Sequence, residues 1–182
     1  ELFSPPAGSV DPAFVTVPGA DNTVNSIAIY TNTAQPTLIG KIVIGGAFTN
    51  YDGSVHRGVA RLNRDASVDP TFNSVGVNLG GAVNAVLVQP DGKVVVAGSF
   101  TTLNTSNRVN LARLNSNGTI DTTFVTGTGL NGAVNAAVLQ PDGKIVIAGA
   151  FTTYNGTNVN LVARINTNGT FDATFNPGTR SE

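Results

Sequence analysis

The sequence predicts an all-β chain made of tandem repeats. One apolar segment occurs three times at intervals of about fifty residues, at positions 41–48, 93–100 and 144–151. In addition, Asn, Thr and Gly are abundant in the intervening segments, whereas Glu occurs only at the two ends and Lys only three times. This composition disfavours helices and favours short strands joined by turns.

Each repeat is expected to begin with a β-hairpin. In the second repeat, residues 83–88 and 93–100 are rich in β-branched side chains and flank Pro90-Asp91-Gly92. Proline presets φ and glycine supplies a left-handed residue, so this tripeptide predicts a tight turn. The third repeat has the same turn, whereas the first has a longer connection over residues 31–40.

A second hairpin should complete each repeat. Residues 111–115 and 119–124 flank Ser116-Asn117-Gly118, and Asn-Gly between alternating residues is a strong hairpin pattern. Each repeat is therefore expected to be a four-stranded antiparallel meander.

The register of this second hairpin predicts a cross-strand ion pair. If Asn115 pairs with Thr119, then Arg113 faces Asp121. The same offset recurs in every repeat and gives Arg61 with Asp69, Arg113 with Asp121 and Arg164 with Asp172. We interpret these pairs as structural clamps rather than catalytic groups, and an exposed pair of this kind contributes only about 0–1 kcal/mol.

The first hairpin is apolar on both faces, which predicts how the repeats assemble. Strict alternation places Val83, Ala85 and Leu87 on one face and Val86 and Val88 on the other. A strand that is apolar on both faces must be covered on both, as in the radially stacked blades of a β-propeller. A β-trefoil is the alternative, because three repeats suffice to complete it.

The repeats define the organisation of the chain. Residues 1–182 are expected to form one repeat block with units at about 15–72, 73–124 and 125–175, and residues 9–14 form an extra N-terminal copy of the last strand. Three blades are fewer than the four to eight that close a propeller. The chain is therefore expected to be an open arc, unless two copies form a homodimer that closes a six-bladed ring.

The repeat also resembles a known family. Residues 83–124 carry, in order, Val-Asn, Gln-Pro-Asp-Gly-Lys-Val-Val-Val-Ala-Gly-Ser-Phe, Leu-Ala-Arg-Leu-Asn, Asn-Gly-Thr-Ile-Asp and Thr-Phe, a combination that resembles the delta-60 repeat. The resemblance covers about residues 9–176. It implies propeller blades in large secreted or cell-surface proteins of bacteria, without an assigned activity and without catalytic residues to transfer.

Composition argues against several classes of function. The net charge is −1 and only 12% of residues are charged, so no nucleic-acid partner is expected. The chain has no Cys and a single His, and Asp52, Asp91 and Asp142 lie outside any calcium-binding run. We expect no cofactor, no metal, no membrane span and no enzymatic activity.

The connections between the second and third strands are the most variable parts of the repeats. They cover residues 51–57, 103–108 and 154–158, and their polar and aromatic side chains could bind a glycan or a surface protein. The candidate ligand-binding residues are Tyr51, Asp52, His56, Arg57, Asn104, Arg108, Tyr154, Asn155 and Asn158.

Two functions agree with these patterns. The first is a non-enzymatic structural or interaction module of a secreted or cell-surface bacterial protein, which acts as a scaffold or an adhesive display. The alternative is a lectin-like propeller that binds glycans through its Tyr- and Asn-rich loops. A solution mass measurement would separate the homodimer from an open fragment.

Overall fold

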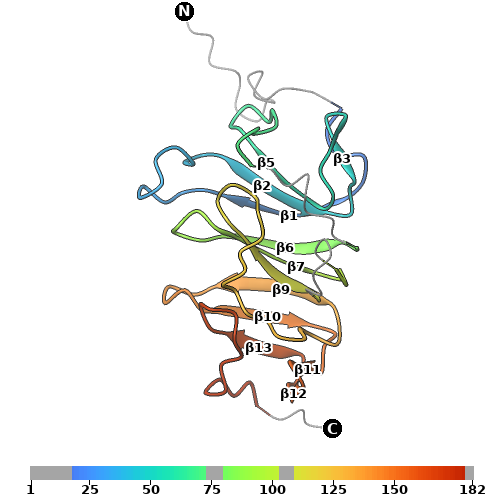
Figure 1. Ribbon diagram of the computed structural model, residues 1–182, viewed down its shortest axis with the longest axis vertical. Helices are drawn as coiled ribbons and strands as arrows, with labels where there is room; N and C mark the ends of the chain where they lie inside the picture. Colours follow the sequence, from blue (N-terminus) through green and yellow to red (C-terminus); the bar gives the residue numbers. More distant parts are fainter. Residues whose placement is uncertain (1–17, 73–79, 103–108, 179–182) are drawn as a thin grey trace, which may run out of the picture.

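The structure, a computed structural model, describes residues 18–72, 80–102 and 109–178. All regular secondary structure in these residues is β. It forms three three-stranded antiparallel sheets stacked along the chain (Figure 1), together with two small two-stranded hairpins. The all-β prediction is therefore confirmed. No helix among the described residues has the length and apolarity needed to cross a membrane.

The first sheet contains β1 (Val24–Ile29), β2 (Ile42–Gly46) and β5 (Val59–Leu62) in the order β1-β2-β5. Between β2 and β5 the chain forms a small separate hairpin of β3 (Asn50–Tyr51) and β4 (Ser54–Val55). The long connection between β1 and β2 still closes an antiparallel pair, in the place of the Pro-Asp-Gly turn of the other repeats.

The second and third sheets repeat this order. Their strands are β6 (Val83–Val88), β7 (Val94–Gly98) and β8 (Leu111–Leu114), then β9 (Val134–Leu139), β10 (Ile145–Gly149) and β13 (Val162–Ile165). The third repeat also carries a small hairpin, formed by β11 (Thr153–Tyr154) and β12 (Thr157–Asn158).

The predicted fourth strand is reduced to a single bridge in each repeat. In the second repeat the register is the expected one, because Leu114 bridges Ile120 and the Asp121 amide donates to the Arg113 carbonyl at 2.9 Å. Pairing then stops, because the Asp121 carboxylate accepts hydrogen bonds from the backbone and hydroxyl of Thr123 and turns the chain away. Three-stranded sheets with a bridged fourth segment replace the expected four-stranded meander.

A β-bulge changes which face of β6 carries Val83. The register of β6 against β7 shifts between Val83 and Ala85, so Val83 joins Val86 on the side of the first sheet, while Ala85 lies on the side of the third. The strict alternation predicted from the sequence was wrong at this position. The prediction that both faces are covered was correct, because each contributes to a different buried cluster.

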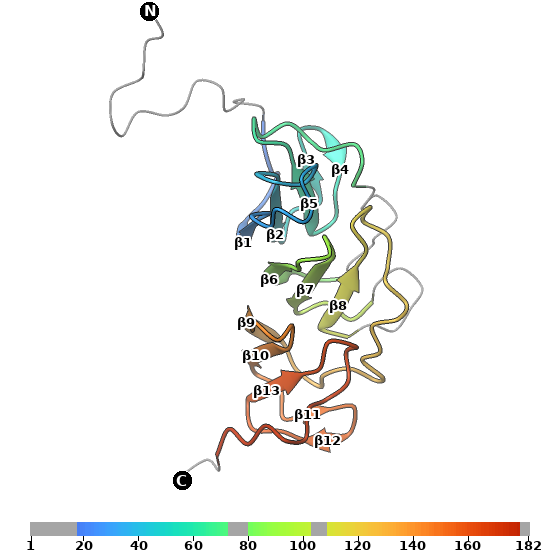
Figure 2. The same cartoon turned by 90° about the vertical axis from the view of Figure 1, so that its left-hand side faces the viewer.

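The three sheets stack face to face and fan outward. The inner strands lie close together, β1 against β6 and β6 against β9, whereas the outer strands are spread apart (Figure 2). One apolar cluster fills the space between the first two sheets and another the space between the last two. This stacking is that of propeller blades, not of the trefoil alternative, and the described residues form an open stack. The predicted extra strand at 9–14 lies outside the described residues.

Candidate functional site

A dense polar arrangement surrounds Asp121. One carboxylate oxygen, Oδ2, accepts from Arg113 Nε at 2.7 Å and lies 3.0 Å from Lys93 Nζ. The other, Oδ1, accepts from the Thr123 amide at 2.9 Å and from its hydroxyl at 2.6 Å. The Arg113 guanidinium in turn lies 4.6 Å from the centre of the Phe124 ring. These contacts connect the start of β7, strand β8 and the turn at residues 121–124.

The same cluster occurs in the other two repeats. The Arg–Asp pairs anticipated from the sequence are present, with Nε–Oδ2 distances of 2.7 Å for both Arg61–Asp69 and Arg164–Asp172. The corresponding lysines, Lys41 and Lys144, lie 2.6 and 2.8 Å from the same carboxylates. We call these three sets the Lys-Arg-Asp clusters.

The clusters are more buried than the exposed pairs considered above. Arg61 is 2% exposed and Asp69 1%, and Arg113 and Asp121 are also buried. A buried ion pair does not by itself add much stability, but loss of one partner is costly because it leaves an uncompensated charge. The clusters therefore act as constraints on the fold rather than as surface ion pairs.

Hydrogen bonding controls the ionisation of these carboxyls. Burial by itself would raise the pKa of Asp121, but donors from Thr123, Lys93 and Arg113 outweigh burial and hold that pKa well below its ordinary value of 3.8. The pKa of Asp69 is lowered in the same way. At neutral pH both groups are carboxylates that accept hydrogen bonds, which does not suit a general acid.

These shifts predict a loss of stability in acid. At pH values between the ordinary pKa of these aspartates and their lower pKa in the folded chain, the unfolded chain binds protons that the folded chain does not. The stability of the fold therefore falls as the pH drops through this range. Buried His56, whose pKa is lowered by desolvation, contributes with the same sign below its ordinary 6.5. We expect the melting temperature to fall slightly below about pH 6.5 and steeply from about pH 5 to pH 2. Calorimetry across this range, at one protein concentration, provides the test, and a melting temperature that stays constant down to pH 2 would contradict it.

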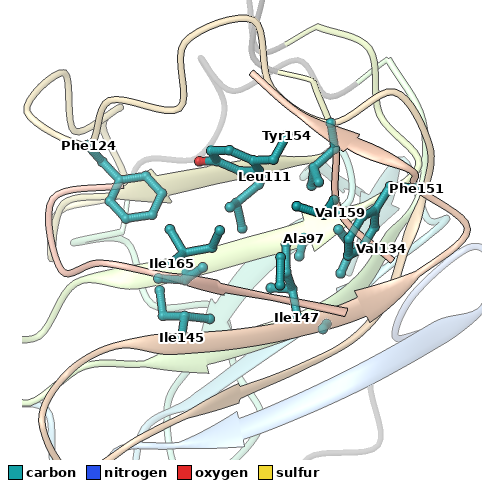
Figure 3. Close-up of a cluster of buried hydrophobic side chains, with 14 residues drawn as sticks. Ala97, Leu111, Phe124, Val134, Ile145, Ile147, Phe151, Tyr154, Val159 and Ile165 are labelled. Carbon is teal, nitrogen blue, oxygen red and sulfur yellow. The ribbon is translucent and has the colours of Figure 1, made fainter. Parts of the chain in front are cut away.

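The two tyrosines proposed as ligand contacts are core residues. Tyr51 is 7% exposed and Tyr154 1%, and their hydroxyls donate to the carbonyls of Ala66 and Gly169. Figure 3 shows Tyr154 among the apolar side chains between the second and third sheets. Their rings are therefore not available to stack on a sugar, and that part of the sequence interpretation was wrong.

The other candidates divide into three groups. His56 is buried at 4% exposure. Asp52, Arg57, Asn155 and Asn158 are exposed at the small hairpins. Asn104 and Arg108 lie outside the described residues.

One groove lies beside an exposed candidate. It has a volume of about 560 Å³, and its lining includes Phe48, Thr49, Asn50 and Arg57 from the first repeat and the Gly81 region of the second. Two of the lining residues, Thr49 and Asn50, are held in place by Asp21, whose carboxylate accepts hydrogen bonds from their backbone amides and side chains. The groove offers one cation and several polar groups to a small polar ligand.

Sequence reasoning missed the residues that join one sheet to the next. Asn25 Nδ2 donates to the Val83 carbonyl at 3.0 Å, and Asn84 Nδ2 donates to the Val134 carbonyl at 2.9 Å. Both kinds of contact have a signal in the sequence: the Val-Asn dipeptide recurs in every repeat, and each Lys lies at the same distance before its Asp.

Within residues 18–72, 80–102 and 109–178, no group of three or more His, Cys, Asp or Glu side chains is placed to hold a metal ion. The carboxylates of the clusters are paired with cations, so they have little capacity left for a metal ligand role.

Comparison with known families identifies the repeat. Residues 40–72, 89–124 and 140–175 match a family model described as "Domain of unknown function (DUF5122) beta-propeller". The chain belongs to the DUF5122 β-propeller family. This membership confirms the resemblance to the delta-60 repeat. A search of the curated proteins gave no match.

The DUF5122 match covers the parts of the repeat that hold the clusters. Each matched segment contains one complete Lys-Arg-Asp cluster and its terminal Phe, and each lies inside one of the three repeats expected from the sequence. The features shared by DUF5122 repeats in this chain are therefore those that hold a sheet together, and the family description assigns no chemistry to them.

Proposed function

We propose that this chain is a non-enzymatic structural and interaction module of a secreted or cell-surface bacterial protein, acting as a scaffold or an adhesive display. One observation carries the proposal: the charged residues common to all three repeats are used within and between sheets. By contrast, the exposed polar candidates Asp52, Arg57, Asn155 and Asn158 lie at the small hairpins, whose sequences differ between repeats. Constant packing with variable surface loops suits a display function.

Turnover and adhesion assays test this proposal. The purified chain should show no turnover on hydrolase substrate panels. Beads coated with the chain should adhere to a cell or matrix surface, and the variants Asp52→Asn and Arg57→Ala should weaken adhesion while melting as the unaltered chain does. Asp142→Asn, on an exposed turn outside these hairpins, serves as the control and should leave adhesion unchanged. Turnover that is abolished by one loop substitution with the fold intact would refute the non-enzymatic role.

The groove beside Arg57 favours a second candidate, a lectin-like function with a small polar glycan as ligand. Because Tyr51 is buried, recognition would depend on Arg57, Thr49 and Asn50 through hydrogen bonds rather than on ring stacking. A glycan array decides this candidate. A hit that disappears with Arg57→Ala but persists with Asn158→Ala, on the other small hairpin, would support it, and an array without hits would eliminate it.

A further inference from the structure

The two contacts between sheets use the same hydrogen bonds at equivalent positions. Arg61 Nη1 donates to the Ser116 carbonyl at 2.7 Å across the first pair of sheets, and Arg113 Nη1 donates to the Thr167 carbonyl at 2.7 Å across the second. The Asn25 and Asn84 side chains donate forward in the same direction. At these Arg and Asn positions the first sheet donates to the second and the second donates to the third, so this part of the interface is directional.

The third sheet carries both donors of this interface without an acceptor. Arg164 and Asn135 are the counterparts of Arg113 and Asn84. Arg164 bonds Asp172 and Thr174 within its own repeat, and the described residues contain no acceptor for its Nη1 or for the exposed Asn135 side chain. Phe175 and Arg164 form the same stacked pair as in the other repeats, with the guanidinium 4.9 Å from the ring centre.

A buried acceptor in the same repeat is also unsatisfied. Gln140 Oε1 is buried and has no hydrogen-bond partner among the described residues. Its counterpart in the second sheet, Gln89 Oε1, accepts from Arg113 Nη1 at 3.4 Å, where that nitrogen is also anchored on the Thr167 carbonyl. An acceptor placed beyond the third sheet would hold Arg164 in the equivalent position and let it satisfy Gln140.

The outward face of the first sheet supplies the complementary half. Ile27 and Ile29 are 63% and 51% exposed, yet their counterparts in the second sheet, Val86 and Val88, pack against the first sheet. The carbonyl that corresponds to Ser116 and Thr167 is that of Arg64, in an exposed turn. The first sheet therefore presents the accepting, apolar side of an interface that the chain forms twice internally.

The third sheet is apolar at the matching place. Val138 is 63% exposed on its outward face, whereas its counterpart in the first sheet, Ala28, packs into the cluster between the first and second sheets. The outward faces of the first and third sheets are thus the two halves of one interface. The same interface is assembled twice within the chain, between the first and second sheets and between the second and third. Exposed apolar faces of this kind mark association surfaces.

We propose that the outward face of the third sheet binds the outward face of the first sheet of a second copy of this chain, and that two copies close head to tail into a ring of six sheets. Directional interfaces form rings when the rotation per unit closes. The fan of sheets in Figure 2 has the form of a sector, and six lies within the four to eight blades of known propellers. This inference rests on the interface contacts and not on the scaffold or glycan-binding role. Either the ring closure or the proposed function can therefore be refuted without the other.

Light scattering on the purified chain tests the inference. The expected mass is that of two chains. Val138→Asp and Ile27→Asp should each halve it, because in a closed pair every contact contains one of each residue. Val125→Asp places the same charge at a residue that is 53% exposed and outside both faces, so it should remain a dimer. A monomeric unaltered chain, a dimeric Val138→Asp variant or a polydisperse assembly would overturn the closed pair.

Disulfide trapping is a second test, and its result does not depend on whether the fold tolerates a new charged side chain. Across the first pair of sheets the Val86 amide donates to Ser26 Oγ at 3.0 Å, and the counterparts in the new interface are Ile27 and Ala136. The chain has no Cys. Mixing Ala136→Cys with Ile27→Cys under oxidising conditions should give a covalent dimer that neither variant forms alone. Equal yields from the separate variants would overturn the head-to-tail orientation.

Discussion

Asp121→Asn is expected to destabilise the folded chain by about 3–5 kcal/mol, the cost of removing one member of a buried ion pair. The amide keeps the size of the side chain but loses its negative charge. It leaves Arg113, which is 7% exposed, without its anion, whereas Lys93 keeps only the more distant Asp91 carboxylate, 3.8 Å from Nζ. Arg113 also holds the third sheet through the Thr167 carbonyl, so the contact between sheets should weaken as well.

Denaturant unfolding at neutral pH and fixed protein concentration measures this loss. Asp142→Asn is the matched control: Asp142 is exposed, and its oxygen accepts from the Lys144 amide, a role that Asn can retain. We expect the control to change stability by no more than about 0.5 kcal/mol. If Asp121→Asn cost only about 1 kcal/mol or less, the cluster would behave as a surface ion pair and its structural role would be refuted.

Gly98→Ala is expected to cost about 3 kcal/mol, in the upper part of the range for overpacking a core. A Cβ at residue 98 would come within 2.1 Å of the Ala82 carbonyl oxygen and 2.9 Å of the Val83 Cα, at the start of the paired strand. Both are backbone atoms next to the bulge, so they cannot move aside as a flexible side chain would. The methyl group would break the register that brings Val83 into the core.

The neighbouring substitution Ser99→Ala provides the control for Gly98→Ala. Ser99 is exposed, and its backbone bond to the Ala82 carbonyl does not involve its side chain. Thermal and denaturant unfolding of the two variants should differ by several kcal/mol, with Ser99→Ala within about 0.5 kcal/mol of the unaltered chain. Equal stability of the two variants would show that the close approach at Gly98 does not constrain the sheet.

The close contact at Gly98 is predictable from the sequence, but its partner is not. A glycine in a strand indicates that another backbone lies near, without saying which one. Here the nearby backbone belongs to the same sheet. Gly45, one residue earlier in its repeat, is the position that faces the next sheet, because a Cβ there would come within 2.6 Å of both Val83 and Val86 side chains.

Local spacing by itself determined the repeat, its first hairpin and the cross-strand Arg–Asp register. Residues that meet across a tight turn are close in sequence, and their offset fixes the pairing. Tertiary structure decided what depends on distant segments. It placed Tyr51 and Tyr154 in the core and turned Val83 to the other face of its strand through a bulge. It also brought the Thr167 carbonyl of the next sheet within hydrogen-bond distance of Arg113. The outward faces of the first and third sheets stay exposed in the same stack. A sheet buries a face, and donates hydrogen bonds in one direction, only where another whole sheet packs against it.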